Sequence, residues 1–134
     1  MKKGYVWAFL MFVFFYAATV GAQGEKPAAL TVEAKVCTGV QDRMPVGEAT
    51  TFPATVDQVY LWTKIIGAPG EITVKHVWVH NGKEMTTVDL PVKTAAYRTW
   101  SAKKILPQWT GQWEVRVVGP DGATLATVPF TIGE

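Results

Sequence analysis

The sequence contains one cysteine, Cys37, and one serine, Ser101. One cysteine excludes an internal disulfide framework and a zinc site built on paired cysteines. The lone serine has no Gly-x-Ser-x-Gly motif around it, so the signature of a hydrolase nucleophile is absent. On a strand, His76 and His80 would lie about 13 Å apart, too far to share one metal ion at bond lengths near 2 Å. We therefore predict no metal, no cofactor and no enzymatic activity.

Runs of basic residues are also missing. Apart from Lys2 and Lys3, 11 of the 13 basic residues remain, and 11 acidic residues balance them. A formally neutral domain without a basic stretch has no electrostatic footprint for nucleic acid or for an anionic membrane surface. Nucleic acid is therefore not an expected partner, and no membrane contact is expected beyond the N-terminal segment.

The only long hydrophobic run lies at the N-terminus. Lys2 and Lys3 precede an uncharged apolar stretch that begins at Gly4 and ends in small residues at Ala22. This is the pattern of a signal peptide, predicted over residues 1–22; an uncleaved anchor is the alternative, because about 20 apolar residues span the hydrocarbon core. Residues 23–29 are predicted to be a flexible leader and 30–134 a single domain. The expected location is the periplasm of a bacterium or the space outside the cell.

A sustained helical period is absent after residue 22, and strand-forming residues dominate. Fifteen Val and fifteen Thr stand against five Leu in this part of the chain, a composition that favours pleated sheet. Apolar alternation predicts strands at 30–38, 48–52, 56–66, 72–80, 84–92, 97–105, 112–118 and 123–132. The Asn81-Gly82 pair between two of them predicts a tight hairpin turn. The expected fold is all-β, an immunoglobulin/fibronectin-like β-sandwich of seven to eight strands.

Several residues refine this expectation. Strand 56–66 is apolar on both faces and is predicted to lie centrally in its sheet. Pro91 and Pro129 fall inside strands and predict edges or bulges, because proline cannot donate to a ladder. The sequence 42–45, Asp-Arg-Met-Pro, is predicted to be a turn. Cys37 is expected to be a buried thiol, with a reactive or intermolecularly paired cysteine as the alternative.

Tryptophan is abundant, and each indole could fill the core or form a binding surface. Trp62 and Trp113 are predicted to lie in the core and Trp109 to be exposed, while both readings stay open for Trp78 and Trp100. Alternation puts His76 and Trp78 on one strand face, and Arg98 and Trp100 on one face of another strand. If the two strands approach each other, they form a cationic and aromatic patch that suits a carboxylate, a sugar acid or an aromatic ring. Alternatively, Arg98 braces a loop carbonyl or Asp89. The candidate ligand-binding residues are His76, Trp78, Arg98, Trp100 and Trp109.

Six short motifs, in this order, resemble the bacterial family known as domain of unknown function 2914. They are Asp42-Arg43-x-Pro45, Val59-Tyr60-Leu61-Trp62-Thr63, His76-x-Trp78 before Asn81-Gly82, Arg98-Thr99-x-Ser101, Gly111-x-Trp113-x-Val115, and Asp121-Gly122-x-x-Leu125 with Phe130. The resemblance covers about residues 30–132. It implies a short exported or membrane-anchored bacterial protein, or a C-terminal module, without an activity to transfer. It places His76, Trp78, Arg98, Thr99 and Ser101 at motif positions.

Three functions follow as hypotheses. The first is a non-enzymatic binding module of the bacterial cell envelope whose ligand is a glycan or a protein partner. The second is a structural or assembly accessory that pairs with a partner through a long sheet edge free of proline and charge, expected at strand 30–38. The third is an enzyme with His76 as general base, which would need a concave pocket and an acid near His76.

Overall fold

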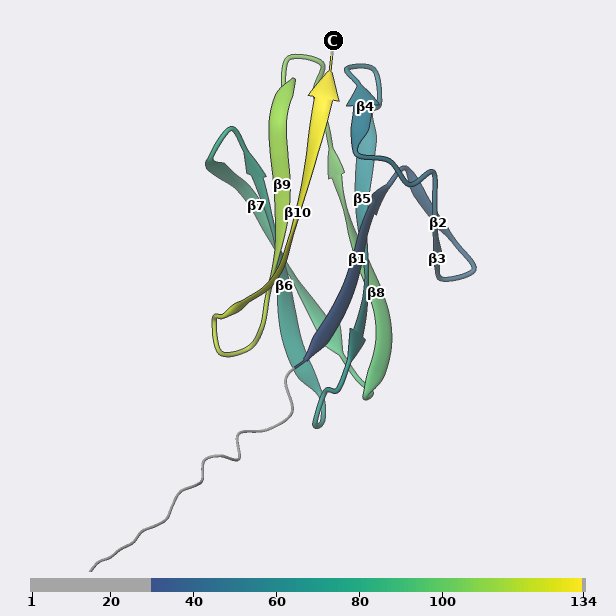
Figure 1. Ribbon diagram of the computed structural model, residues 1–134, viewed down its shortest axis with the longest axis vertical. Helices are drawn as coiled ribbons and strands as arrows, with labels where there is room; N and C mark the ends of the chain where they lie inside the picture. Colours follow the sequence, from purple (N-terminus) through teal and green to yellow (C-terminus); the bar gives the residue numbers. More distant parts are fainter. Residues whose placement is uncertain (1–29, 134) are drawn as a thin grey trace, which may run out of the picture.

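The computed structural model describes residues 30–133, which form ten strands and no helix (Figure 1). The strands are β1 (Thr31–Cys37), β2 (Gly39–Gln41), β3 (Met44–Val46), β4 (Thr51–Pro53), β5 (Gln58–Ile66), β6 (Ile72–His80), β7 (Lys83–Val92), β8 (Ala96–Lys104), β9 (Gly111–Val118) and β10 (Thr124–Gly133). The predicted signal peptide, 1–22, and leader, 23–29, lie outside the described residues. Within 30–133, no helix is long and apolar enough to cross a membrane.

Two sheets form the two layers of the molecule. One has three strands in the order β1-β5-β8, and the other has five in the order β4-β10-β9-β6-β7. The layers face each other in Figure 1, while the β2–β3 hairpin stands beside the three-stranded sheet. All pairs are antiparallel except β4 with β10. The all-β sandwich predicted from the sequence is confirmed, with β5 at the centre of its sheet as expected.

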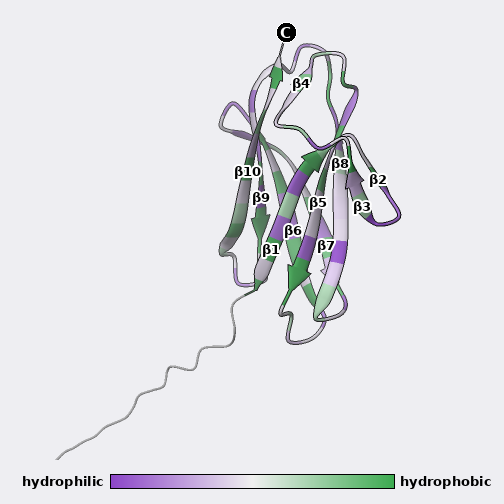
Figure 2. Ribbon diagram, turned by 45° about the vertical axis from the view of Figure 1, so that its right-hand side comes forward, coloured by the Kyte–Doolittle hydropathy of each residue, from purple (hydrophilic) through white to green (hydrophobic). Residues whose placement is uncertain are grey.

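The core lies between the layers because alternate side chains of each strand point inward. Figure 2 shows this alternation of hydrophobic and hydrophilic residues along the strands. Trp113 stacks on Phe130 with ring centroids 5.9 Å apart, and Trp78 meets Phe130 edge-on at 6.2 Å. Trp113 is 2% exposed and therefore fills the core as predicted. Cys37 is fully buried, as expected of a structural thiol.

Most predicted strands agree with the observed ones within a few residues, and 72–80 agrees with β6 at both ends. Asn81 and Gly82 have φ of 49° and 84°, as the two-residue hairpin turn requires. The weakest prediction was 48–52, where the strand is the three-residue β4, Thr51–Pro53.

The β2–β3 hairpin was not predicted, and the turn expected at 42–45 is shorter than expected. Asp42 and Arg43 form the turn with φ of 51° and 63°. Met44 and Pro45 continue into β3 instead. This hairpin could not be predicted, because its turn lacks the Asn-Gly or Asp-Gly pair that normally supplies positive φ. The two extra strands raise the total from the predicted seven or eight to ten.

The two prolines predicted to fall inside strands lie where a ladder bond is not needed. Pro91 is in β7, the edge strand of the five-stranded sheet. Pro129 is in β10, which pairs with β4 only from Thr131 to Gly133. At Pro129 the strand β10 therefore has a neighbour on one side only, and it is locally an edge.

Candidate functional site

His76 and Trp78 lie in the interior of the sandwich. Both project from the inner face of β6, and both are 0% exposed. Val117 of β9 and Val88 of β7 are the cross-strand neighbours of His76. These two candidate residues therefore form no part of the molecular surface.

A network of polar contacts joins the two sheets at this point. Ser101 Oγ of β8 lies 2.7 Å from His76 Nδ1 and accepts a hydrogen bond from Trp78 Nε1 at 3.2 Å. On the other side of the imidazole, Thr63 Oγ1 of β5 lies 3.4 Å from Nε2 and donates to the Thr99 carbonyl at 2.7 Å. With His76 neutral and its proton on Nε2, Ser101 donates to Nδ1 and every polar atom of the network has a partner.

Burial keeps this imidazole neutral. Removal from water disfavours the charged form, and it lowers the pKa of His76 from 6.5 to about 4. No carboxylate pairs with His76 among residues 30–133. No sequence motif predicted that Ser101 and His76 lie together, yet the structure places them in contact. The contact links β6 of one sheet to β8 of the other, and both side chains are almost completely buried.

Arg98 and Trp100 lie on the opposite side of the three-stranded sheet. Thr63 faces the core from β5 and pairs with Thr99 of β8, so the alternate residues Arg98 and Trp100 point outward. The predicted patch of His76, Trp78, Arg98 and Trp100 therefore does not form as one surface. The alternation in the sequence correctly predicted which residues share a strand face. It could not show which face of each strand turns inward.

The outward side chains of β5 and β8 form what we call the outer cationic face, consisting of Lys64, Arg98 and Trp100. Lys64 and Arg98 are direct cross-strand partners, and each is partly buried. Neither has a carboxylate oxygen within 4.0 Å in the described part of the chain. Glu33 lies across from Lys64 on β1, but its carboxylate contacts Lys35 at 3.8 Å.

Two indoles lie side by side on this face. Trp100 of β8 is the cross-strand partner of Trp62 of β5. Trp62 is 1% exposed, because the β2–β3 hairpin covers it and the Arg43 carbonyl accepts its Nε1 proton at 2.9 Å. Trp100 is only partly buried. One indole of the pair is thus accessible beside two cations that have no carboxylate partner within residues 30–133.

The alternative partner proposed for Arg98 is occupied elsewhere. Asp89 pairs with Lys75 at 3.0 Å, on the outer side of the other sheet. No loop carbonyl accepts a hydrogen bond from Arg98 among the described residues. Among the described residues, the Arg98 guanidinium therefore makes neither of the two contacts expected of a structural role.

Trp109 packs against its own loop and sheet. It is partly buried rather than exposed, lies 6.3 Å from Trp113, and accepts the Trp113 Nε1 proton at its carbonyl at 2.9 Å. Lys103 Nζ stands 4.8 Å above its ring. These contacts give Trp109 a bracing role in the loop between β8 and β9.

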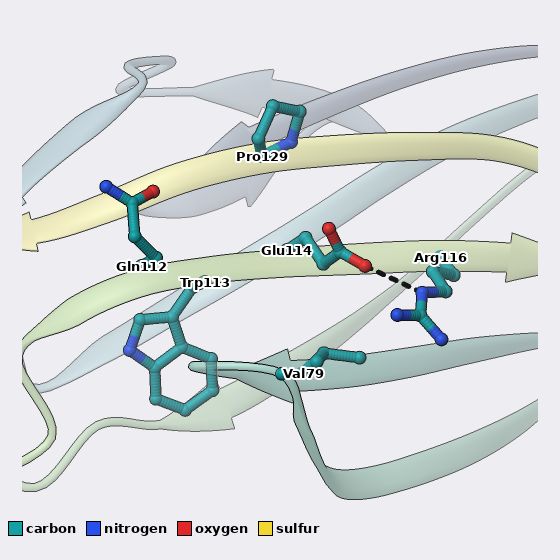
Figure 3. A pocket seen from close by; sticks show the side chains of 7 residues that line it. Val79, Gln112, Trp113, Glu114, Arg116 and Pro129 are labelled. Atoms are coloured by element: carbon teal, nitrogen blue, oxygen red, sulfur yellow. Dashed lines mark hydrogen bonds and ion pairs between the residues drawn. The ribbon is translucent and has the colours of Figure 1, made fainter.

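A separate shallow pocket of about 190 Å³ lies on the outer side of the five-stranded sheet (Figure 3). Glu114 and Arg116 beside it contact each other at 2.7 Å, so their charges are already matched. His76 is not among the lining residues, which are Val79, Gly82, Gln112, Trp113, Glu114, Arg116 and Pro129. Within 30–133, no three His, Cys, Asp or Glu side chains are grouped to hold a metal ion.

The described residues thus define an all-β sandwich domain with a buried histidine–serine contact inside and an unpaired cationic face outside. Residues 71–132 match the family model described as "Protein of unknown function (DUF2914)". The resemblance to this family predicted from the sequence is thereby confirmed. The match covers β6 to β10, whereas the motifs at 42–45 and 59–63 precede it. The comparison with curated proteins found no match.

Proposed function

We propose that this protein is a non-enzymatic binding module of the bacterial cell envelope, and that its ligand, a glycan or a protein partner, presents negative charge to the outer cationic face. The observation that supports this most directly is the pair Lys64 and Arg98, which lie opposite each other without a carboxylate partner among the described residues.

The chemistry of this face favours an acidic ligand. Like charges directly opposite each other on neighbouring strands destabilise a sheet, so a bound carboxylate would relieve a cost that the free protein carries. A guanidinium can bind a carboxylate through two parallel hydrogen bonds. The accessible indole of Trp100 offers a flat apolar surface on which a sugar ring or a side chain can stack.

Binding of a short polyuronate, measured by titration calorimetry, tests the proposal. Arg98→Ala and Trp100→Ala should each weaken binding by about tenfold or more, the equivalent of one charged hydrogen bond or one stacking contact. Lys83→Ala is the matched control, because it removes one exposed charge from the distant β6–β7 hairpin. Unchanged affinity in Arg98→Ala would refute the role of this face.

Assembly through a sheet edge is the second candidate. The strand expected to supply the edge, β1, is an edge strand of the three-stranded sheet and contains no proline. Part of this edge is already used, since the Val36 carbonyl accepts a hydrogen bond from Ala49 N at 3.2 Å. The edge better suited to pairing with a partner strand is β8, at the other side of the same sheet.

Catalysis with His76 as base gains no support from the geometry. His76 is 0% exposed and Ser101 is 7% exposed, so a substrate could reach them only if the sheets separated. The pocket described above does not include His76, and its one acid is paired with Arg116.

A further inference from the structure

The outer edge of β8 is the longest proline-free strand edge in the described structure. All nine residues of β8 pair with β5 on one side, and β8 is the last strand of its sheet. Edges of this kind are templates for a further strand, and proteins usually block them. The other edges are blocked or short: β7 carries Pro91, β4 has three residues and ends at Pro53, and β1 is covered at Val36.

Hydrogen bonds at both ends of β8 determine which of its residues direct their N–H and C=O groups to the free edge of the sheet. Ile105 N donates to the Asp57 carbonyl at 2.8 Å, and Gly67 N donates to the Ala95 carbonyl at 2.7 Å. Both pairs continue the β5–β8 register. Because hydrogen-bonded and non-hydrogen-bonded pairs alternate in an antiparallel ladder, the odd-numbered residues of β8 bond to β5.

The even-numbered residues therefore turn their N–H and C=O groups to the free edge. Ala96 agrees with this phase, since its carbonyl accepts a hydrogen bond from Thr94 Oγ1 at 2.9 Å. No side chain or loop of residues 30–133 bonds to the backbone of Arg98, Trp100 or Ala102. The residues with open backbone groups thus include the two whose side chains contribute to the outer cationic face.

We propose that an extended acidic segment of a partner protein adds to β8 as a further strand, so the inference rests on the proposed function and specifies its ligand. Main-chain bonds to Arg98, Trp100 and Ala102 would supply affinity, and alternate side chains would supply specificity. A partner residue directly opposite Arg98 places its side chain about 5 Å away on the same face. An acidic residue fits there, and a β-branched or aromatic one fits opposite Trp100.

Charge distinguishes this occupant from a second copy of the chain. If two β8 edges paired, the unpaired Lys64 and Arg98 of both copies would share one continuous outer face. An acidic segment instead matches these charges.

The substitution Ala102→Pro tests the edge without touching the cationic face. The Ala102 N–H points to solvent, so proline removes an edge donor but no bond to β5. The probes are fluorescent ten-residue peptides that alternate Glu with Val, Thr or Tyr, and the same polyuronate as above. The wild-type protein should bind at least one peptide, and Ala102→Pro should weaken that binding by about tenfold or more while polyuronate binding stays unchanged.

The outcomes separate the two proposals. Arg98→Ala should weaken both probes; if it weakens neither, the proposed function fails. If Arg98→Ala weakens the polyuronate but no peptide binds, or Ala102→Pro binds peptide like the wild type, the edge proposal fails alone. A dimer that forms in the wild type and is lost in Ala102→Pro would assign the edge to a second copy and overturn the acidic segment.

Circular dichroism and a thermal melt check that Ala102→Pro is folded. If it is not, the wild-type protein is titrated with the bound peptide carrying N-methyl groups on alternate residues. Methylation of the residues that face β8 must abolish binding, and methylation of the intervening residues must not. Equal binding of both methylated peptides would refute strand addition.

Discussion

Ser101 is the residue on which the buried polar network depends. Its hydroxyl is hydrogen-bonded to both the His76 imidazole and the Trp78 indole, at 2.7 Å and 3.2 Å. Ser101→Ala would leave two buried polar atoms without a partner, at about 1–3 kcal/mol for each. We expect urea denaturation to show a loss in the free energy of unfolding of about 2–6 kcal/mol, the sum for the two atoms. Thr87→Ala, at an exposed position of β7, is the control and should change stability by less than about 1 kcal/mol. A loss no larger than that of the control would contradict the network.

His76 should make stability depend on pH. Burial lowers its pKa from 6.5 in the unfolded chain to about 4 in the folded protein. Between these values the unfolded state binds the proton and the folded state does not, so this stability is complete above pH 6.5 and is lost as the pH falls toward 4. The full shift corresponds to about 3 kcal/mol. Denaturation at pH 7.5 and 4.5 measures it.

His76→Gln separates this effect from other titrations. The variant should be less stable at pH 7.5, yet it should lose less stability than the wild type between pH 7.5 and 4.5. Thr87→Ala, at an exposed position of β7, is the control and should keep the wild-type dependence. An equal slope in His76→Gln and the wild type would assign the acid sensitivity to other groups.

The position of His76 shows what the sequence could predict at this scale. Alternation correctly placed His76 and Trp78 on one face of a strand, because the strand period is two. It did not show that this face is the core face, since histidine is common at binding sites and also tolerated inside when its nitrogens have partners. The one residue that could have indicated a buried position for His76 was Ser101, a polar partner on the inner face of β8.

At the scale of elements, Gly47 determines whether the β2–β3 hairpin can fold back over Trp62. Its φ is +75°, and an added Cβ would collide with the Thr38 hydroxyl. Gly47→Ala should therefore destabilise the protein by more than about 1 kcal/mol and shift the Trp62 emission to longer wavelength. Gly39→Ala in the same hairpin meets nothing within 4 Å and serves as the matched control. Fluorescence spectra and urea denaturation of the two variants would measure this, and equal behaviour would contradict the packing.

Strands were predicted well where the residues of the adjoining turn are typical of that turn type, and poorly where they are not. Asn81-Gly82 fixed the ends of β6 and β7, because both residues readily adopt positive φ. Asp42 and Arg43 adopt the same region, but an arginine there carries no such signal. The hairpin that covers Trp62 was therefore missed, and with it the reason why Trp62 is buried on the outer side of its sheet.

At the scale of the whole molecule, three of the five described indoles are buried and two are accessible. Trp62, Trp78 and Trp113 are at most 2% exposed, whereas Trp100 and Trp109 are partly buried. Acrylamide should thus quench two classes of tryptophan. Trp100→Phe should reduce the accessible fraction, whereas Trp62→Phe, which removes a buried indole, should raise it.

Iodide extends the same measurement to charge. Because Lys64 and Arg98 lack a carboxylate partner within residues 30–133, they should concentrate an anion beside Trp100 but not beside Trp109, whose neighbour Lys103 contributes one charge. Iodide should then quench Trp100 more strongly than acrylamide accessibility alone predicts. Arg98→Ala should remove this excess, and 0.5 M chloride should screen it. If iodide and acrylamide quench Trp100 in the same proportion as Trp109, the outer cationic face attracts no anion, and an acidic ligand loses its physical basis.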